Sequence, residues 1–134
     1  MNSNHALCVD AACSGNPGPM EYRGVHIPSG KEVFRFGPIQ GTNNIGEFLA
    51  IVHALALLKQ KGVSMPIYSD SVSGMAWVRN RKAKTTLEYN EKTAQALDLV
   101  RRAERWLKEN AVTVPVLKWN TEEWGEIPAD FGRK

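Results

Sequence analysis

The pattern of apolar and polar positions divides the chain into a first part made of strands and a second part in which helices alternate with strands. Residues 6–11 form a short apolar run, typical of a buried strand. The stretches 21–28 and 32–37 predict two more strands, joined by a hairpin at Pro28-Ser29-Gly30-Lys31. Because no helix separates these three strands, we expect an antiparallel meander.

In the second part, apolar residues recur at helical spacing and short apolar runs lie between them. Elements are predicted at residues 44–60 (helix), 66–68 (strand), 71–80 (helix), 90–110 (helix) and 112–119 (strand). Gly62 ends the first of these helices and Asn90 caps the last one. Strands joined through helices pair in parallel. The order therefore predicts an α/β fold with a mixed five-stranded sheet, three antiparallel strands and then two parallel ones, flanked by helices.

Length and composition fit one soluble globular domain spanning residues 1–134. The chain is 43% hydrophobic and 23% charged, with a net charge of +3, which permits a nucleic-acid partner. It contains no apolar run long enough to span a membrane, and its first residues lack the pattern of a signal peptide. Cys8 and Cys13 lie too close together in sequence to cross-link a fold, so we expect reduced thiols and a cytoplasmic location. We also expect a monomer.

Acidic residues follow or begin several of the predicted elements. Asp10 ends the first strand, Asp70 ends the fourth, Glu47 lies in the first turn of the first helix, and Asp130 lies in the polar tail. The carboxyl ends of parallel strands meet at one edge of a sheet, where ligands bind. Converging carboxylates need a cation, and oxygen ligands favour Mg²⁺ or Mn²⁺. Two such ions about 4 Å apart would activate water and stabilise the leaving oxygen in phosphodiester hydrolysis.

Each acidic residue also has a purely structural interpretation. Glu47 follows Asn44 by three residues and could close a capping box. Asp70 could cap the helix that follows it, and Asp130, after Pro128, could be a solvated tail residue. Coincidence explains any one of these placements but explains all four together poorly.

Taken together, the motifs resemble those of the type 1 ribonucleases H. Asp10-Ala11-Ala12-Cys13-Ser14-Gly15-Asn16-Pro17-Gly18 resembles the first motif of that family, and Thr42-Asn43-Asn44-Ile45-Gly46-Glu47 resembles the second. Tyr68-Ser69-Asp70-Ser71 resembles the third, and Trp77-Val78-Arg79-Asn80 the helix beyond it. The resemblance covers nearly the whole chain. It implies the ribonuclease H-like sheet and a metal-dependent endonuclease that cuts the RNA strand of RNA–DNA hybrids with little sequence preference.

The resemblance also implies roles for individual residues. Asp10, Glu47, Asp70 and Asp130 would hold two Mg²⁺ ions, for which Mn²⁺ could substitute. Cys13, Asn16 and Asn43 would contact the minor groove of the hybrid or its 2′-hydroxyls, and Thr42 a phosphate of the DNA strand. The remaining expected nucleic-acid contacts are Ser14, Ser71, Trp77, Arg79 and Asn80. The wide, shallow minor groove of a hybrid displays 2′-hydroxyls, which the small residues after Asp10 can approach closely.

The chain departs from the family pattern after the third motif. It lacks the basic-handle insertion, and only a short basic stretch is present, made of Arg79, Arg81, Lys82 and Lys84. These charges could bind the backbone of the hybrid or lie on a solvated loop. Trp77 could likewise support a nucleic-acid contact or pack in the core. Val72 stands where relatives often place a polar residue that touches RNA.

The tail departs from the pattern as well. No histidine lies in the loop before Asp130, and we hypothesise that Glu123, or Glu122, assists proton transfer or product release there. The alternative is that both are surface charges and that metal ions with water suffice. The chain ends four residues after Asp130, so the C-terminal helix is shortened. Asp130 must then be held by Pro128, Phe131 and the preceding loop, or become ordered only with metal.

Two other functions fit the same architecture less well. A 3′-5′ exonuclease with four acidic ligands usually opens with Asp-x-Glu, whereas this chain has Asp10-Ala11-Ala12. Loss of even one of the acidic residues would favour a non-catalytic nucleic-acid binding domain, and none is missing. A structural or interaction protein would leave the placement of the four carboxylates unexplained.

Overall fold

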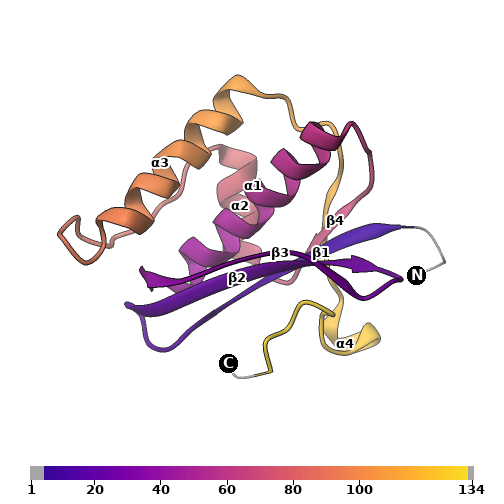
Figure 1. Cartoon of the computed structure of the whole chain (residues 1–134), viewed down its shortest axis with the longest axis horizontal. Coiled ribbons are helices and arrows are strands. Elements are labelled where there is room, and N and C mark those ends of the chain that lie inside the picture. The colour runs from indigo at the N-terminus through magenta and orange to yellow at the C-terminus, as the bar shows by residue number, and fades with distance from the viewer. Residues whose placement is uncertain (1–4, 133–134) are drawn as a thin grey trace.

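The computed structural model describes residues 5–132 and has a mixed five-stranded sheet with the long helices on one face (Figure 1). The strands, in the order β3-β2-β1-β4-β5 across the sheet, are β1 (Ala6–Cys13), β2 (Gly18–Ile27), β3 (Lys31–Gly41), β4 (Ile67–Ser69) and β5 (Val116–Lys118). The helices are α1 (Asn43–Lys61), α2 (Val72–Asn80), α3 (Ala94–Glu109) and α4 (Thr121–Trp124). β1, β2 and β3 pair antiparallel, whereas β4 pairs parallel with β1 and β5. The predicted fold class is confirmed.

The first strand is longer than the apolar run that predicted it. Pairing between β1 and β2 continues to Cys13 opposite Met20, so Asp10 lies within the strand and not at its end. The parallel partner stops earlier, because the last register pair of β1 with β4 is Val9 and Ser69. Asp10 and Asp70 therefore each directly follow the last residue that pairs β1 with β4. The predicted end of β1 was wrong, but Asp10 and Asp70 still lie together where the pairing of β1 with β4 ends, as predicted.

Helix boundaries also differ from the prediction at one point. α3 begins at Ala94, four residues after Asn90, because residues 90–93 form a turn. The prediction that Asn90 caps this helix is wrong, because the N-cap residue is Thr93 and no side chain caps it. Asn90 instead stabilises the preceding turn, where its Oδ1 accepts hydrogen bonds from the backbone N–H groups of Lys92 and Thr93. β5 covers only three residues, matching the three residues of β4 with which it pairs. The predicted polar tail contains the short helix α4.

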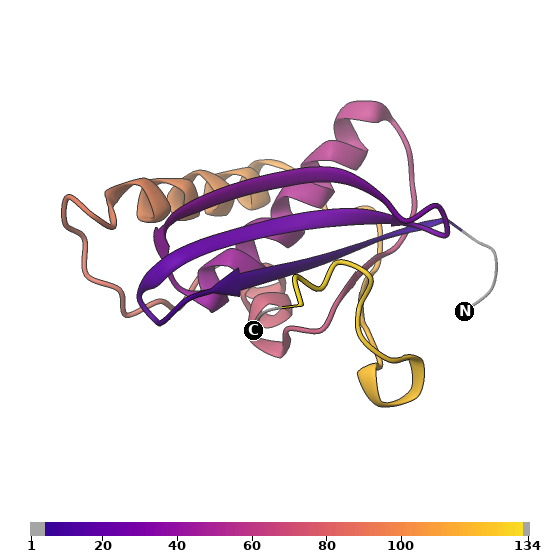
Figure 2. The same cartoon turned by 60° about the horizontal axis from the view of Figure 1, so that its bottom comes forward.

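The two faces of the sheet carry separate cores. The larger core lies between the sheet and the helices, and includes Phe48, Ile51 and Met20. The smaller one lies on the opposite face, where the C-terminal tail crosses the sheet (Figure 2). It buries Ala6, Cys8, Val25, Ile27, Trp119, Ile127 and Ala129. The tail is therefore packed against the sheet through apolar contacts. None of the helices within residues 5–132 is long and apolar enough to cross a membrane.

Candidate active site

Three of the predicted acidic residues converge at the edge of the sheet where β1 and β4 stop pairing. Carboxylate oxygens of Asp10, Glu47 and Asp70 all lie within 4.8 Å of one another. The Asp10 side chain is fully buried, Glu47 is buried at 3% exposure and Asp70 is half-buried. Residues separated by up to 60 positions are thus brought to one point by β1, α1 and the end of β4.

Two glycines allow α1 to bring Glu47 this close. A Cβ at Gly46 would lie 2.8 Å from the Cβ of Ala11 on β1, so a larger residue would push the helix away from the sheet. A Cβ at Gly74 would lie 3.1 Å from the Cβ of Glu47 itself. α1 therefore approaches β1 on one side and α2 on the other only because these positions lack a side chain.

The capping interpretations of Glu47 and Asp70 are wrong. The residue that caps α1 is Thr42, whose Oγ1 accepts a hydrogen bond from the backbone N–H of Ile45 at 3.2 Å. The residue that caps α2 is Ser71, whose Oγ accepts from the N–H of Gly74 at 2.9 Å. Because side-chain hydroxyls cap the N-termini of both helices, neither carboxylate acts as an N-cap.

The donor set fits a hard divalent cation. All three converging side chains offer carboxylate oxygens, the ligands that Mg²⁺ and Mn²⁺ prefer. Three carboxylates this close repel one another strongly in a buried setting, and a dication between them removes that repulsion. Burial of Asp10 and Glu47 fixes their side chains, so little conformational entropy is lost when a cation binds.

Asp130 lies in the tail, outside this compact group of three. Its N–H donates to the carbonyl of Ile127 at 2.9 Å, and its Oδ2 accepts from the N–H of Gly132 at 3.0 Å. Its own carbonyl accepts from Nη2 of Arg23 at 2.7 Å. Arg23, a residue of β2, was not expected to hold the tail. A place for Asp130 among the metal ligands stays a prediction.

Glu123 lies in α4, where it takes part in the cap of that helix. Its backbone N–H donates to Oδ1 of Asn120 at 3.1 Å, and its Oε2 accepts from Nδ2 of the same residue at 3.0 Å. It is exposed and does not belong to the group of three converging acids. The hypothesis that it assists proton transfer stays a prediction.

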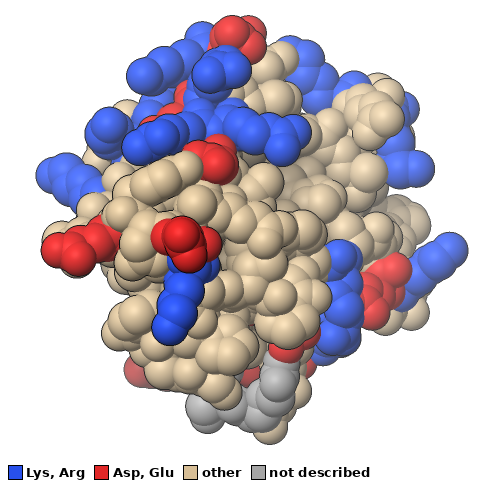
Figure 3. Space-filling view, turned by 60° about the vertical axis from the view of Figure 1, so that its left-hand side comes forward, with Lys and Arg blue, Asp and Glu red and all other residues tan. Residues whose placement is uncertain are grey.

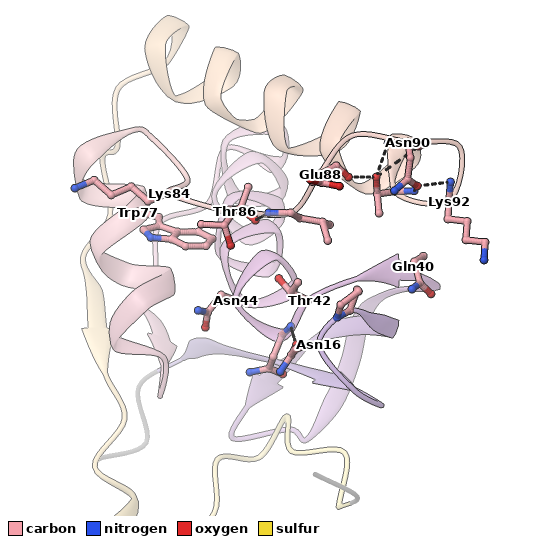
Figure 4. A pocket seen from close by; sticks show the side chains of 15 residues that line it. Asn16, Gln40, Thr42, Asn44, Trp77, Lys84, Thr86, Glu88, Asn90 and Lys92 are labelled. Atoms are coloured by element: carbon pink, nitrogen blue, oxygen red, sulfur yellow. Dashed lines mark hydrogen bonds between the residues drawn. The ribbon is translucent and has the colours of Figure 1, made fainter.

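A groove of about 730 Å³ lies between the β1–β2 turn, the start of α1 and the segment that precedes α3 (Figure 4). Four predicted nucleic-acid residues line it, namely Asn16, Thr42, Asn43 and Trp77. The Oδ1 of Asn16 accepts a hydrogen bond from the N–H of Asn43 at 2.9 Å, which ties the turn to the first residue of α1. The ring of Trp77 packs edge-on against Phe48 and also lines the groove, so it contributes to the core, and its contact with nucleic acid stays a prediction.

The opposite wall of the groove was missed in the sequence. It consists of polar and charged residues from the segment that precedes α3, namely Thr85, Thr86, Glu88, Asn90, Lys92 and Thr93, whereas Gln40 of β3 lies on the side of the sheet (Figure 4). Lys84, which belongs to the predicted basic stretch, lines the same wall. Because residues 83–89 form neither helix nor strand, no periodicity points to the side that faces the groove.

The other predicted nucleic-acid residues lie outside the groove. Cys13 and Ser14 lie at the end of β1 and the start of the turn, and burial raises the pKa of the Cys13 thiol above its ordinary value. Ser71 caps α2, and Arg79 and Asn80 are exposed at the far end of that helix. Their contact with nucleic acid stays a prediction.

Comparisons with known proteins agree with the geometry. The family model of RNase H matches residues 2–119. The chain is 30% identical to ribonuclease H of Rickettsia akari over 97% of this chain and 88% of that one. Solved structures with the same fold include the following two. RNase H1 of the archaeon Halobacterium salinarum (22% identity, 89% and 87% coverage) has a TM-score of 0.56. LC11-RNase H1 from compost, in complex with an RNA/DNA hybrid (17% identity, 90% and 88% coverage), has a TM-score of 0.51. The chain belongs to the ribonuclease H family.

Proposed function

We propose that this protein is a metal-dependent endoribonuclease that hydrolyses the RNA strand of RNA–DNA hybrids with little sequence preference. The observation that carries the proposal is the convergence of Asp10, Glu47 and Asp70 within 4.8 Å in a chain of the ribonuclease H family. A relative of the same fold has been solved with an RNA/DNA hybrid, which supports this substrate class.

In this proposal the carboxylates of Asp10, Glu47 and Asp70, completed by Asp130, hold two Mg²⁺ ions, for which Mn²⁺ can substitute. Bound divalent ions would supply an activated water and charge stabilisation for the leaving oxygen. The chain contributes fixed geometry, because Asp10 is held in the middle of a paired strand and Glu47 between two close helix contacts. Glu123 contributes a further carboxylate that assists proton transfer or product release.

The substrate contacts follow from the groove. Asn16, Thr42 and Asn43 present short polar groups beside the N-terminus of α1, where backbone N–H groups favour a phosphate of the DNA strand. Cys13 and Ser14 approach the minor groove and its 2′-hydroxyls. Ser71, Trp77, Arg79 and Asn80 extend the contact along α2. Contacts of this kind bind the backbone and shape of a hybrid and carry little sequence information.

We also propose that the protein acts as a monomer in the cytoplasm. Cys8 and Cys13 are both free thiols. Burial raises the pKa of Cys8 to about 12, so this thiol stays protonated and unreactive at neutral pH. Free thiols of this kind fit a reducing compartment.

The test compares labelled RNA–DNA hybrid, duplex RNA and duplex DNA, each with Mg²⁺, Mn²⁺ or a chelator. We expect internal cuts confined to the RNA of the hybrid, dependent on metal, and a loss of at least about a hundredfold in Asp10→Asn. Arg105→Met, on the exposed face of α3, serves as the matched control and keeps full activity. Stepwise products from a 3′ end would identify an exonuclease, and binding without cleavage would identify a non-catalytic domain.

A further inference from the structure

Arg23 links β2 to the C-terminal tail at the position of Asp130. Its Nε donates to the carbonyl of Ala129 at 2.8 Å, and its Nη2 donates to the carbonyl of Asp130 at 2.7 Å. One planar guanidinium thus binds two successive carbonyls, an arrangement that fixes the direction of the tail as well as its position.

The ring of the next residue strengthens the same attachment. The guanidinium carbon of Arg23 lies 5.0 Å from the centroid of the Phe131 ring, and that of Arg35 lies 5.2 Å from it. Arg35 is itself held by Glu32 at 2.6 Å and by Glu21 at 3.3 Å. Residues 129–131 are therefore bound by two arginines of neighbouring strands, which act on backbone and ring together.

The strand register places this attachment beside the acidic cluster. Arg23 is the cross-strand partner of Asp10, so both side chains leave the sheet on the same face. Ala129 packs in the same buried cluster as Cys8, which lies two positions before Asp10 on β1 and thus on that face too. By binding these two carbonyls, Arg23 therefore holds the tail against the part of β1 that carries Asp10.

We propose that Arg23 is a positioning residue that sets the carboxylate of Asp130 beside Asp10. This inference rests on the proposed function of Asp130 as the fourth metal-binding carboxylate. Arg23 touches neither metal nor substrate in this role, and it acts through the backbone of residues 129 and 130.

The test uses Arg23→Met, Asp130→Asn and the double variant, with Arg105→Met on α3 as the matched control. If Arg23 acts through Asp130, Arg23→Met lowers kcat between about tenfold and a hundredfold while KM for the hybrid changes less than about twofold. In the Asp130→Asn background the same substitution changes kcat less than about twofold, because the two changes are then coupled. An undiminished effect in the double variant would overturn the inference.

Two readouts do not depend on catalysis. Arg23→Met raises hydrogen–deuterium exchange at residues 128–132 but leaves exchange in β1 and β2 unchanged, and it weakens Mn²⁺ binding, measured from the spin resonance of free Mn²⁺, by about threefold or more. If wild-type protein cuts no hybrid, the proposed function fails, whereas these two measurements still decide the role of Arg23. Wild-type Mn²⁺ binding in Arg23→Met would refute it.

Conservative variants keep the test decisive if Arg23→Met fails to fold. Arg23→Lys retains the charge but cannot bind both carbonyls with one planar group, so we expect intermediate kcat and Mn²⁺ binding. Full wild-type values in Arg23→Lys would show that charge alone matters and would contradict a positioning role. Phe131→Leu removes the contacts of the aromatic ring with Arg23 and Arg35 and is expected to show the same changes to a smaller extent.

Discussion

Asp10, Glu47 and Asp70 lie close enough to repel one another when no cation lies between them. Two of the three are buried, where Coulomb interactions are screened less than at the surface. The energetic cost of holding these charges together in the folded protein is released when a dication binds. The acidic cluster is thus expected to lower stability in the absence of metal and to couple metal binding to folding.

Removing one charge from the cluster tests this coupling. In the presence of a chelator, Asp10→Asn is expected to raise the free energy of unfolding by about 1 to 3 kcal/mol, because like-charge repulsion decreases. The increase in Tm that Mg²⁺ gives the wild type should shrink in the variant. Thermal unfolding with chelator and across a Mg²⁺ titration measures both effects.

The matched control is Asp98→Asn on α3, where the carboxylate is exposed and lies 4.0 Å from Arg101. This substitution is expected to change stability by less than about 0.5 kcal/mol and to leave the Mg²⁺ response intact. A lower Tm of Asp10→Asn in chelator would show that the carboxylate of Asp10 stabilises the metal-free fold.

At the scale of secondary structure elements, the position of α1 against the sheet decides where Glu47 lies. Gly46→Ala would place a methyl group 2.8 Å from the Cβ of Ala11 and 3.0 Å from Sδ of Met20. Although alanine favours helix, the overlap is expected to cost about 1 to 3 kcal/mol of stability and to shift α1 outward. Mn²⁺ affinity, measured by calorimetry, should fall at least about threefold.

A control of similar energetic size separates stability from positioning. Leu58→Ala truncates a buried side chain on the same helix, about three turns from Glu47, and costs about 2 kcal/mol or more. It is expected to lower Tm and to leave Mn²⁺ affinity within about twofold of the wild type. If both variants lose affinity alike, general destabilisation explains the loss and the close approach at Gly46 has no special role.

Elements and acids with strong local signals could be predicted from the sequence. The helical spacing within α1 and the acids after β1 and β4 are such signals, and they led to Asp10, Glu47 and Asp70. Contacts between segments that are far apart in the sequence have no such local signal. The bond from Arg23 to Ala129 spans 106 positions, and no periodicity in either segment indicates the other. Strand ends were missed because pairing with β2, and not apolar character, determines how far β1 extends.

At the scale of the whole molecule, basic side chains gather on more than one surface. Lys and Arg lie over the upper part of the face in Figure 3, where α3 carries Arg101, Arg102, Arg105 and Lys108, all exposed. The groove has its own basic residues, Lys84 and Lys92, on the wall opposite Asn16 and Thr42. With a net charge of only +3, the distribution of charge and not its total must direct a polyanion to the acidic cluster.

The salt dependence of binding distinguishes these surfaces. Hybrid affinity is measured in Asp10→Asn, which prevents cleavage, over a series of salt concentrations. Lys84→Met in this background is expected to reduce the slope of log Kd against log salt by about 1, because one phosphate contact and its released counterion are lost. Lys108→Met on α3 should leave the slope unchanged. The reverse pattern would place the hybrid over α3, where a backbone held by Arg101 and Arg105 would not run along the groove beside Asn16.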